Sequence, residues 1–372
     1  MELTIKREEL NEKLNIVSKA ISTKAIVPIL TGIKFDLKDT GLFLTTSNDD
    51  IAIETFIDKK KIKNIGETGS IIIPGIYFLS IIRKLDDKYI TMSTDGLNIN
   101  ITTTHGEYSL NGMNPNEFPN IKFNLLDKPV KLQSQILKNI INQTSFAVST
   151  QESRPVLTGI NFQIEKDKLE CIATDSYRLA KKIVFLDKEI EEHINVVIPG
   201  RNLIELNTLL AEDEEEIEMH IFSNSVLFKT KELLFQSRLL NDNYPDVSKL
   251  IPTDFEVTIK VDLIDFYNTL DRVSLLTDEK DKNLVKMVLK DKELTLTSTS
   301  QEIGKMEETM KITKDSDIDM TIAYSSKYMM EALRTLKCNN IDIRLNSEIK
   351  PIIIKNTEDD NLIQLILPIK TF

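Results

Sequence analysis

The amino-acid sequence predicts an α+β fold of three repeated domains, each with two helices packed on antiparallel sheet. Three observations support this prediction. Similar segments recur along the chain at a nearly constant offset, and apolar residues in some segments follow the spacing of one helix face. Other segments alternate apolar and polar residues, as strands with one solvated face do. Two helices on one face of a sheet form an α+β arrangement.

Four sets of matching segments carry the repeat. They occur in the same order, and one third of the 372 residues is close to their offset, so three copies fill the chain. We therefore expect domains at residues 1–121, 128–252 and 253–372. The matches are "IVPILTGIKF" (26–35) with "SRPVLTGINF" (153–162); "LFLTTSNDDIAIETFI" from Leu42 with the segments from Leu169 and Leu294; "IIIPGIYFLSIIRKL" (71–85) with "VVIPGRNLIELNTLL" (196–210) and more weakly with 320–336; and "NEFPNI" (116–121) with "DNYPDV" (242–247).

The helices and strands of each repeat are expected in a fixed order. The first helix has apolar residues three and four positions apart, and the second follows each "IPG" turn, or "AYSS" in the third repeat, where Ser325 or Ser326 is the expected N-cap. Between the helices, segments such as "KLECIAT" and "TLTSTS" predict antiparallel strands. The apolar positions of the first helices are Leu10, Leu14, Val17 and Ile21; Ile136, Leu137, Ile140 and Ile141; and Leu263, Phe266, Tyr267, Leu270 and Val273.

The composition is that of a folded protein. Hydrophobic residues make up 41% of the chain, which argues against disorder. No apolar run approaches the length of a membrane span, and the N-terminus lacks the layout of a signal peptide, so a cytosolic location is expected. Cys171 and Cys338 fit a reducing compartment and do not suggest a disulfide framework.

The net charge of −11 argues against nucleic acid until its distribution is considered. The expected domains carry −2, −4 and −5, yet residues 128–151 contain Lys128, Lys131 and Lys138 and no acid, and residues 68–85 contain no acid either. Acids gather at 212–218. We therefore expect neutral or basic helices, with locally favourable cations at helix C-termini as the alternative explanation. The third repeat departs from this pattern, because its first helix carries Asp262, Asp265 and Asp271.

Repeated units with different ends can close head to tail into a ring. Two chains would supply twelve helices. At about 10 Å between axes, these helices span roughly 120 Å of circumference. This circumference corresponds to a diameter of about 38 Å between helix axes on opposite sides of the ring. After subtraction of about 10 Å for helix thickness, a hole about 28 Å wide remains. Duplex DNA, with grooves about 8 Å deep on each side, is roughly 20 Å across and fits inside.

The sequence resembles the bacterial sliding-clamp family, the beta subunits of DNA polymerase III. The resemblance covers the whole chain through "VPILTGI", "ATDSYRLA", "VIPGRNLIEL", "QSRLLNDNYPDVSKLIP" and "LILPIKTF". It implies a homodimer that forms a six-domain ring around duplex DNA, is opened by a clamp loader, and tethers the replicative polymerase and other clients at replication forks. It implies no cofactor, no metal and no catalysis.

The resemblance also implies a pocket between the second and third domains that receives a short peptide from each client. Its apolar floor would take aliphatic or aromatic side chains. Family members often have Gly-His where this chain has Ser176-Tyr177, and Arg where it has Lys249, so the peptide preference is expected to differ. The implied pocket residues are Leu157, Thr174, Asp175, Ser176, Tyr177, Arg178, Leu179, Pro245, Lys249, Leu250, Leu365, Ile366, Leu367, Pro368 and Ile369.

Two further groups of residues are expected to contact DNA or the partner subunit. The DNA-facing candidates are Lys24, Lys138, Gln151, Arg154 and Arg201, for which ordinary solvated side chains are the alternative. For the dimer contact, Leu110 is expected to meet Leu275 and Leu276, with Glu302 and Glu307 nearby. The alternative for these leucines is an ordinary place in the core.

Enzyme and metal functions lack the necessary residue patterns. Asp175 and Ser176 would need a histidine base, but His105, His193 and His220 stand in no recognised arrangement, and neighbours on one strand point to opposite faces. The segment "DSDID" (315–319) lacks the Gly and closing Glu of a calcium loop, and neither a phosphate-binding Gly loop nor a Cys/His cluster occurs. The competing hypothesis is a repeat-built enzyme or a DNA-binding protein that does not close into a ring.

Overall fold

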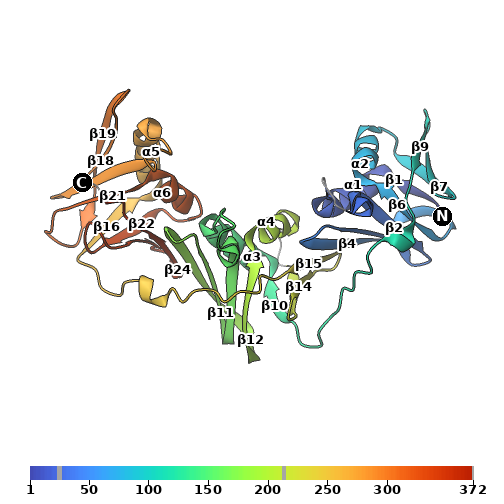
Figure 1. Ribbon diagram of the computed structural model, residues 1–372, viewed down its shortest axis with the longest axis horizontal. Coiled ribbons are helices and arrows are strands. Elements are labelled where there is room, and N and C mark those ends of the chain that lie inside the picture. The colour runs from blue at the N-terminus through green and yellow to red at the C-terminus, as the bar shows by residue number, and fades with distance from the viewer. Residues whose placement is uncertain (23–26, 212–214, 371–372) are drawn as a thin grey trace. The chain divides into compact units, whose positions relative to one another are not determined.

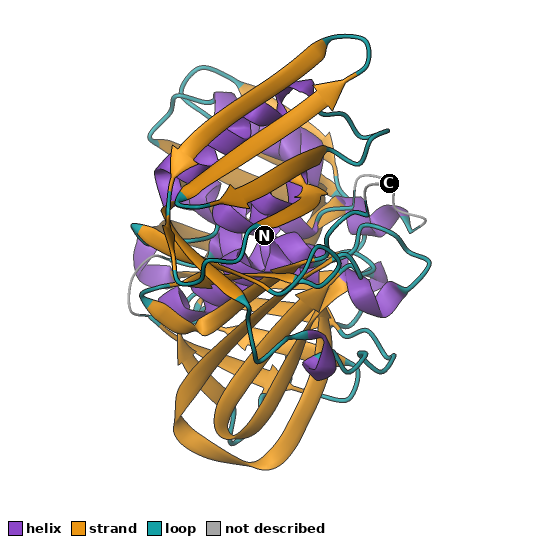
Figure 2. Cartoon of the chain, turned by 90° about the vertical axis from the view of Figure 1, so that its left-hand side faces the viewer, coloured by secondary structure: helices purple, strands orange, loops and turns teal. Residues whose placement is uncertain are grey.

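The structure, a computed structural model, describes residues 1–22, 27–211 and 215–370. Strands dominate it, and the strand pairings found in these residues are antiparallel (Figures 1 and 2). The described chain forms two compact units, one of Met1–Gln135 with Glu205–Leu239 and one of Ile136–Ile204 with the chain from Leu240 onward. No helix in the described ranges is both long and apolar enough to span a bilayer.

The first unit contains two antiparallel sheets among its described residues. One has the order β5-β1-β7-β8-β9, and the other has the order β10-β13-β14-β15-β4-β3-β2-β6. The longer sheet runs through two repeats because β15 pairs with β4, with Phe235 opposite Ile53. The strands are β1 (Glu2–Lys6), β2 (Gly32–Lys38), β3 (Gly41–Ser47), β4 (Ile51–Asp58), β5 (Ile62–Glu67), β6 (Gly69–Pro74), β7 (Tyr89–Asp95), β8 (Asn98–Thr102), β9 (Glu107–Asn111), β10 (Val130–Gln133), β13 (Glu216–Ile221), β14 (Ser225–Lys229) and β15 (Leu233–Arg238).

The second unit is built in the same way. Its sheets, in the described residues, have the orders β11-β12-β24-β23-β22-β16-β20 and β19-β18-β17-β21. The longer one again joins two repeats, here through the pairing of β12 with β24. The strands are β11 (Gly159–Thr174), β12 (Arg178–Pro199), β16 (Val257–Asp262), β17 (Leu284–Lys290), β18 (Glu293–Ser300), β19 (Gly304–Lys311), β20 (Thr313–Lys314), β21 (Met320–Ser325), β22 (Asn340–Leu345), β23 (Ile352–Asn356) and β24 (Asp359–Ile366).

Helices occur in pairs, as the repeat predicted. The first unit holds α1 and α2, the second holds α5 and α6, and the division between the units passes through α3 and α4. The α-helices are α1 (Arg7–Val17), α2 (Gly75–Lys84), α3 (Ser134–Thr144), α4 (Gly200–Leu209), α5 (Leu263–Val273) and α6 (Ser326–Leu333), and the 3₁₀ turns are η1 (Ser18–Ala20), η2 (Pro28–Thr31), η3 (Lys59–Lys61), η4 (Pro115–Glu117), η5 (Ser145–Ala147), η6 (Pro155–Thr158), η7 (Ser248–Leu250) and η8 (Ser274–Leu276).

Helix α1 ends earlier than its apolar spacing predicted. Leu10, Leu14 and Val17 are buried, but the α-helix stops at Val17 and Ile21 lies beyond the following 3₁₀ turn. The side chain of Thr46 explains the ending, because its Oγ1 donates to the Val17 carbonyl at 2.6 Å. In the third repeat the Ser298 hydroxyl donates to the last carbonyl of α5 at the same distance.

The acids at the start of α5 have a local structural role. Asp262 is the N-cap, and its Oδ1 accepts a hydrogen bond from the Asp265 N–H at 2.9 Å. Negative charge in this position also complements the helix dipole. At α6 the N-cap is Ser325, the first of the two predicted serines. These local needs account for Asp262 and Asp265, whereas Asp271 lies in the last turn of α5 and is not explained by them.

Equivalent contacts confirm the predicted repetition. A Cβ on Gly32 would lie 2.3 Å from Ile72, and one on Gly159 would lie 2.6 Å from Val197. The facing strands then make matching isolated bridges, from Ile72 to Met113 and from Val197 to Leu240. The first two repeats therefore need Gly at this place, because a neighbouring strand occupies the space of a side chain. The third repeat has Leu284 at the start of the equivalent strand, opposite Ser325.

Candidate functional site

The stretch 174–178 is a tight turn between two long strands. β11 ends at Thr174 and β12 begins at Arg178. The expectation that Asp175 and Ser176 lie on one strand, facing opposite sides, is therefore wrong. Ser176 has a φ of +78°, in the left-handed region that non-glycine residues rarely adopt.

Side chains of the turn itself hold this conformation. Thr174 Oγ1 donates to the Arg178 carbonyl at 2.6 Å and accepts from the Ser176 N–H at 3.1 Å. Asp175 Oδ1 accepts from the N–H groups of Tyr177 at 2.9 Å and Arg178 at 3.0 Å. The carboxylate and hydroxyl in this stretch are thus occupied with backbone groups, as in Asx and ST turns.

The guanidinium of Arg178 is also occupied within the fold. Its Nε donates to Asp175 Oδ2 at 3.0 Å, and its Nη1 pairs with Glu331 on α6. The group lies 4.4 Å from the ring centre of Tyr328 and 5.4 Å from that of Phe146. Arg178 is only 8% exposed. These contacts make it a residue that positions the turn.

Sequence reasoning missed Tyr244. Its hydroxyl accepts a hydrogen bond from the Thr174 N–H at 2.9 Å, and burial raises the pKa of the phenol above its ordinary value. The tyrosine lies in "DNYPDV", a repeat segment and part of a family motif, from which only its neighbour Pro245 was assigned to the site. A polar tip on an aromatic ring next to a predicted site was the available signal.

The pairing of β12 with β24 brings distant predicted residues together. Leu179 stands opposite Leu365, and the Leu367 N–H donates to the Tyr177 carbonyl at 2.8 Å. Leu179 and Leu365 share a buried apolar cluster with Val247. Successive side chains on a strand alternate between faces, so Ile366 faces away from this cluster and packs in the core of the third repeat. Ile366 therefore does not share the apolar cluster that Leu179 and Leu365 form.

Exposed apolar side chains border this buried cluster. Tyr177 is 60% exposed and Leu250 53%, whereas Leu157 is buried. Leu367, Pro245 and Lys249 are exposed, and Thr174 is buried. Pro368 and Ile369 are half-buried, and the Ile369 N–H donates to the Ala323 carbonyl at 2.7 Å. The surface around the 174–178 turn therefore offers several apolar contacts, with Lys249 as an exposed charged group.

Lys249 and Leu250 also line a neighbouring pocket of about 540 Å³. Its other walls come from 252–256, Asn346, Lys350 and Pro351, none of which was predicted. The volume lies within the range of about 300–1,000 Å³ typical of small-ligand sites. Of the predicted residues, only these two line it in the described part of the chain.

The candidates for DNA contact occupy different places in the fold. Gln151 and Arg154 are exposed in the segment before η6, and Arg201 is exposed in the first turn of α4. Lys138 is half-buried on α3. Lys24 lies outside the described residues.

The dimer candidates lie on and beside strands at the edges of sheets. Leu110 is on β9, the last strand of its sheet in the first unit, and Glu307 is on β19, the last strand of its sheet in the second. Leu275 and Leu276 form part of η8, and Glu302 is exposed in the turn before β19. Leu275 is 71% exposed, which excludes the alternative of an ordinary core residue at this position.

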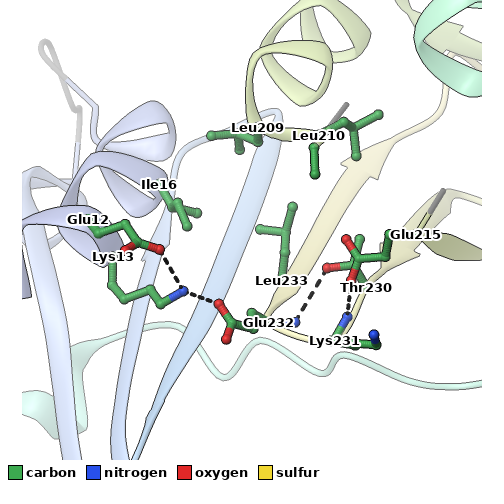
Figure 3. Close-up of a pocket in the computed structure, with 11 residues that line it drawn as sticks. Glu12, Lys13, Ile16, Leu209, Leu210, Glu215, Thr230, Lys231, Glu232 and Leu233 are labelled. Carbon is green, nitrogen blue, oxygen red and sulfur yellow. Dashed lines mark hydrogen bonds and ion pairs between the residues drawn. The ribbon is translucent and has the colours of Figure 1, made fainter. Parts of the chain in front are cut away.

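A second pocket, of about 570 Å³, lies in the first unit between α1 and the β14–β15 turn (Figure 3). Lys13 is buried at its wall, 3.3 Å from Glu12 and paired with Glu232. The hydrogen bond from Lys13 holds the pKa of Glu232 below its ordinary value. The charges at this wall satisfy one another, so we assign the ion pair a structural role.

Catalytic and metal-binding arrangements are missing from the described residues. They contain no group of three or more His, Cys, Asp or Glu side chains placed to hold a metal ion. His105 and His193 are exposed, His220 is buried on β13, and no hydrogen bond within the described ranges joins a histidine to Ser176. Cys171 and Cys338 are both free thiols.

Comparison with known proteins accounts for all three repeats. The family models for the N-terminal, central and C-terminal domains of the DNA polymerase III beta subunit match residues 1–122, 131–246 and 248–370. The chain is 42% identical to the beta sliding clamp of Staphylococcus aureus and 41% to that of Staphylococcus epidermidis, with full coverage of both chains in each comparison. This chain belongs to the bacterial sliding-clamp family.

Solved sliding clamps have the same fold. The clamp of Bacillus subtilis matches with a TM-score of 0.96 and 37% identity, and the DNA polymerase III beta chain of Streptococcus pneumoniae with 0.94 and 32%, each over 100% of both chains. Membership of the sliding-clamp family confirms the predictions of three α+β clamp domains and of a non-catalytic processivity subunit of DNA polymerase III. The Gly that family members often have at position 176 fits the positive φ there.

Proposed function

We propose that this sliding clamp acts as a ring-shaped homodimer that encircles duplex DNA, is opened by a clamp loader, and tethers the replicative polymerase and other clients at replication forks. Its full-length similarity to proteins named as sliding clamps carries the proposal. The division into domains at 1–121, 128–252 and 253–372 is part of it. Two chains then supply the six domains of the ring.

Open sheet edges support head-to-tail closure. β9 and β19 each have a strand on one side only within their own sheets. An exposed edge strand is a ready template for pairing with another chain. We propose that β9 of one subunit lies beside β19 of the other, with Leu110 against Leu275 and Leu276 and with Glu302 and Glu307 at the rim. This arrangement would cover the highly exposed side chain of Leu275.

DNA contact is assigned to a small set of polar and basic side chains. The net charge of −11 makes DNA binding by electrostatic attraction alone unfavourable. A closed ring instead retains DNA because the DNA passes through it. Phosphate contacts then need only guide sliding. The residues proposed to face DNA are Lys24, Lys138, Gln151, Arg154 and Arg201.

Client peptides are proposed to bind along the 174–178 turn and β24. The buried leucines 179 and 365 supply an apolar floor, and the exposed side chains of Tyr177, Leu250 and Leu367 supply contacts that a peptide can cover. Free backbone groups of a bound peptide would add hydrogen bonds. Ser176-Tyr177 and Lys249 distinguish this chain from the common family pattern and set its peptide preference.

Retention on circular DNA tests the proposal directly. The protein is loaded onto nicked circular duplex by a compatible clamp loader, the salt concentration is raised, and the circle is then cut once. A ring should survive the salt and leave only after cutting, whereas groove binding should weaken steeply as counterions compete. Loss from intact circles, in an assay where a control clamp stays bound, contradicts encirclement.

A further inference from the structure

The connector between the first two repeats, residues 122–129, is held by a buried histidine. It leads into β10 and has no regular secondary structure (Figure 1). The Leu126 N–H in its middle donates a hydrogen bond to Nδ1 of His220 at 2.8 Å. His220 lies on β13 and is only 1% exposed.

This hydrogen bond requires an uncharged imidazole. A backbone N–H can only donate, so Nδ1 must offer a lone pair and the ring proton must sit on Nε2. Nε2 lies 3.4 Å from Glu218 Oε2. A second proton on the ring would go to Nδ1, where it would face the Leu126 N–H. Two donors cannot share one hydrogen bond, so protonation and connector binding exclude each other.

Charged groups around the ring do not remove this conflict. Glu218 on β13 favours the charged imidazole, but its Oε2 is also 2.8 Å from Lys229 Nζ on β14, and its Oε1 is 3.6 Å from Lys131 Nζ on β10. In the connector, Asp127 and Lys128 are exposed neighbours of Leu126. Burial outweighs the carboxylate and lowers the pKa of His220 below its ordinary value.

We propose that His220 is a pH-sensitive anchor that releases the 122–129 connector when its imidazole gains a proton. The β4–β15 ladder does not involve this bond and keeps the first two repeats joined after release. The sign follows from linkage. The native state favours neutral His220, so the anchor is fully formed above the pKa of a free histidine, about 6.5, and weakens as the pH falls below it.

Amide hydrogen exchange tests the anchor in the full-length protein. Exchange at Leu126 is measured between about pH 7.5 and about pH 5, spanning the ordinary histidine pKa. His220→Asn is the key variant, because the Asn side-chain oxygen can occupy the place of Nδ1 and does not titrate in this range. His193→Asn removes an exposed histidine and is the matched control. Each wild-type rate is divided by the His220→Asn rate at the same pH, which cancels the chemistry of exchange.

This ratio is expected to rise severalfold toward acid pH, because protonation of His220 removes the acceptor of the Leu126 N–H. The His193→Asn protein should follow wild type. A ratio that does not change with pH contradicts the proposal. Wild-type NMR provides a second test that does not depend on variant folding. The His220 ring and the Leu126 amide should shift with the same midpoint, and a ring that does not titrate over this range also overturns the anchor.

Discussion

Arg178 joins its own turn to α6 through one side chain. It pairs with Asp175 in its own turn and with Glu331 on α6, and it lies over the ring of Tyr328. We expect Arg178→Ala to lower the free energy of unfolding by about 3 kcal/mol, because breaking a buried pair leaves its carboxylates uncompensated. Arg178→Lys should recover only part of this stability. A lysine ammonium lacks the planar guanidinium, which can donate two parallel hydrogen bonds and stack on an aromatic ring.

Urea unfolding of both variants measures this cost. Arg154→Ala, at an exposed arginine that forms no ion pair within the described residues, is the matched control and should change stability by less than about 0.5 kcal/mol. An Arg178→Ala protein as stable as the control would show that the turn does not depend on this side chain.

Two buried tyrosines should respond in opposite directions to loss of the hydroxyl. Tyr324 is fully buried and its hydroxyl has no hydrogen-bond partner in the described residues, whereas the Tyr244 hydroxyl accepts from Thr174. Tyr324→Phe should therefore stabilise the protein by about 1 kcal/mol, and Tyr244→Phe should destabilise it by about 1–2 kcal/mol. Thermal unfolding of the Tyr324→Phe and Tyr244→Phe variants measures both changes in stability. A destabilising Tyr324→Phe would show that the Tyr324 hydroxyl has a hydrogen-bond partner.

Among elements, the glycine that begins β11 tests how closely two strands approach. A Cβ on Gly159 would lie 2.6 Å from Val197 and 2.8 Å from the Ile198 carbonyl oxygen. We expect Gly159→Ala to destabilise the protein by about 1–3 kcal/mol, because the neighbouring backbone must move. At Gly106 the nearest atom would be 3.7 Å away, so Gly106→Ala should have little effect. Equal melting temperatures for the two variants would disprove the explanation that close approach of the neighbouring strand requires Gly at position 159.

The ion pair between α1 and the β14–β15 turn gives a pH dependence. The Lys13 hydrogen bond lowers the pKa of Glu232, so the pair stabilises the folded state above the ordinary carboxyl pKa and is lost as the pH falls through the lowered value. Glu232→Gln should therefore be less stable than wild type near neutral pH, and the difference should shrink below about pH 4. Urea unfolding across this range, with exposed Glu348→Gln as control, tests the sign. A constant difference would refute it.

The strand pairing that places the candidate site could not be predicted from local sequence. Asp175, Tyr177 and Leu179 were identified because they lie in one short segment. The contact of their neighbour Arg178 with Glu331 and the pairing of Leu179 with Leu365 depend on α6 and on the β12–β24 ladder, more than 150 residues away along the chain. Tyr244 was missed for the same reason, since only the folded chain brings it to Thr174.

At the scale of the whole molecule, the proposed dimer can be tested with a single substitution. Leu275 is 71% exposed in η8, beside the open edge of β19 in the proposed interface. Leu275→Asp should place a charge in an apolar contact and weaken dimerisation by at least about tenfold. Ile318→Asp, at another exposed apolar residue, is the control. Sedimentation over a range of concentrations measures both, and an unchanged dimer in Leu275→Asp contradicts this interface.

Repetition and periodicity along the chain were enough to predict three α+β repeats, because both can be read from the order and spacing of residue types. The same order of motifs identified the sliding-clamp family. Three-dimensional packing settled what short segments leave open. The 174–178 stretch forms a turn, and Arg178 makes an ion pair with Glu331 on α6. Ile366 and Leu365 pack in different apolar clusters. Such outcomes depend on which distant strands pair and which face each side chain takes, and only the folded chain determines both.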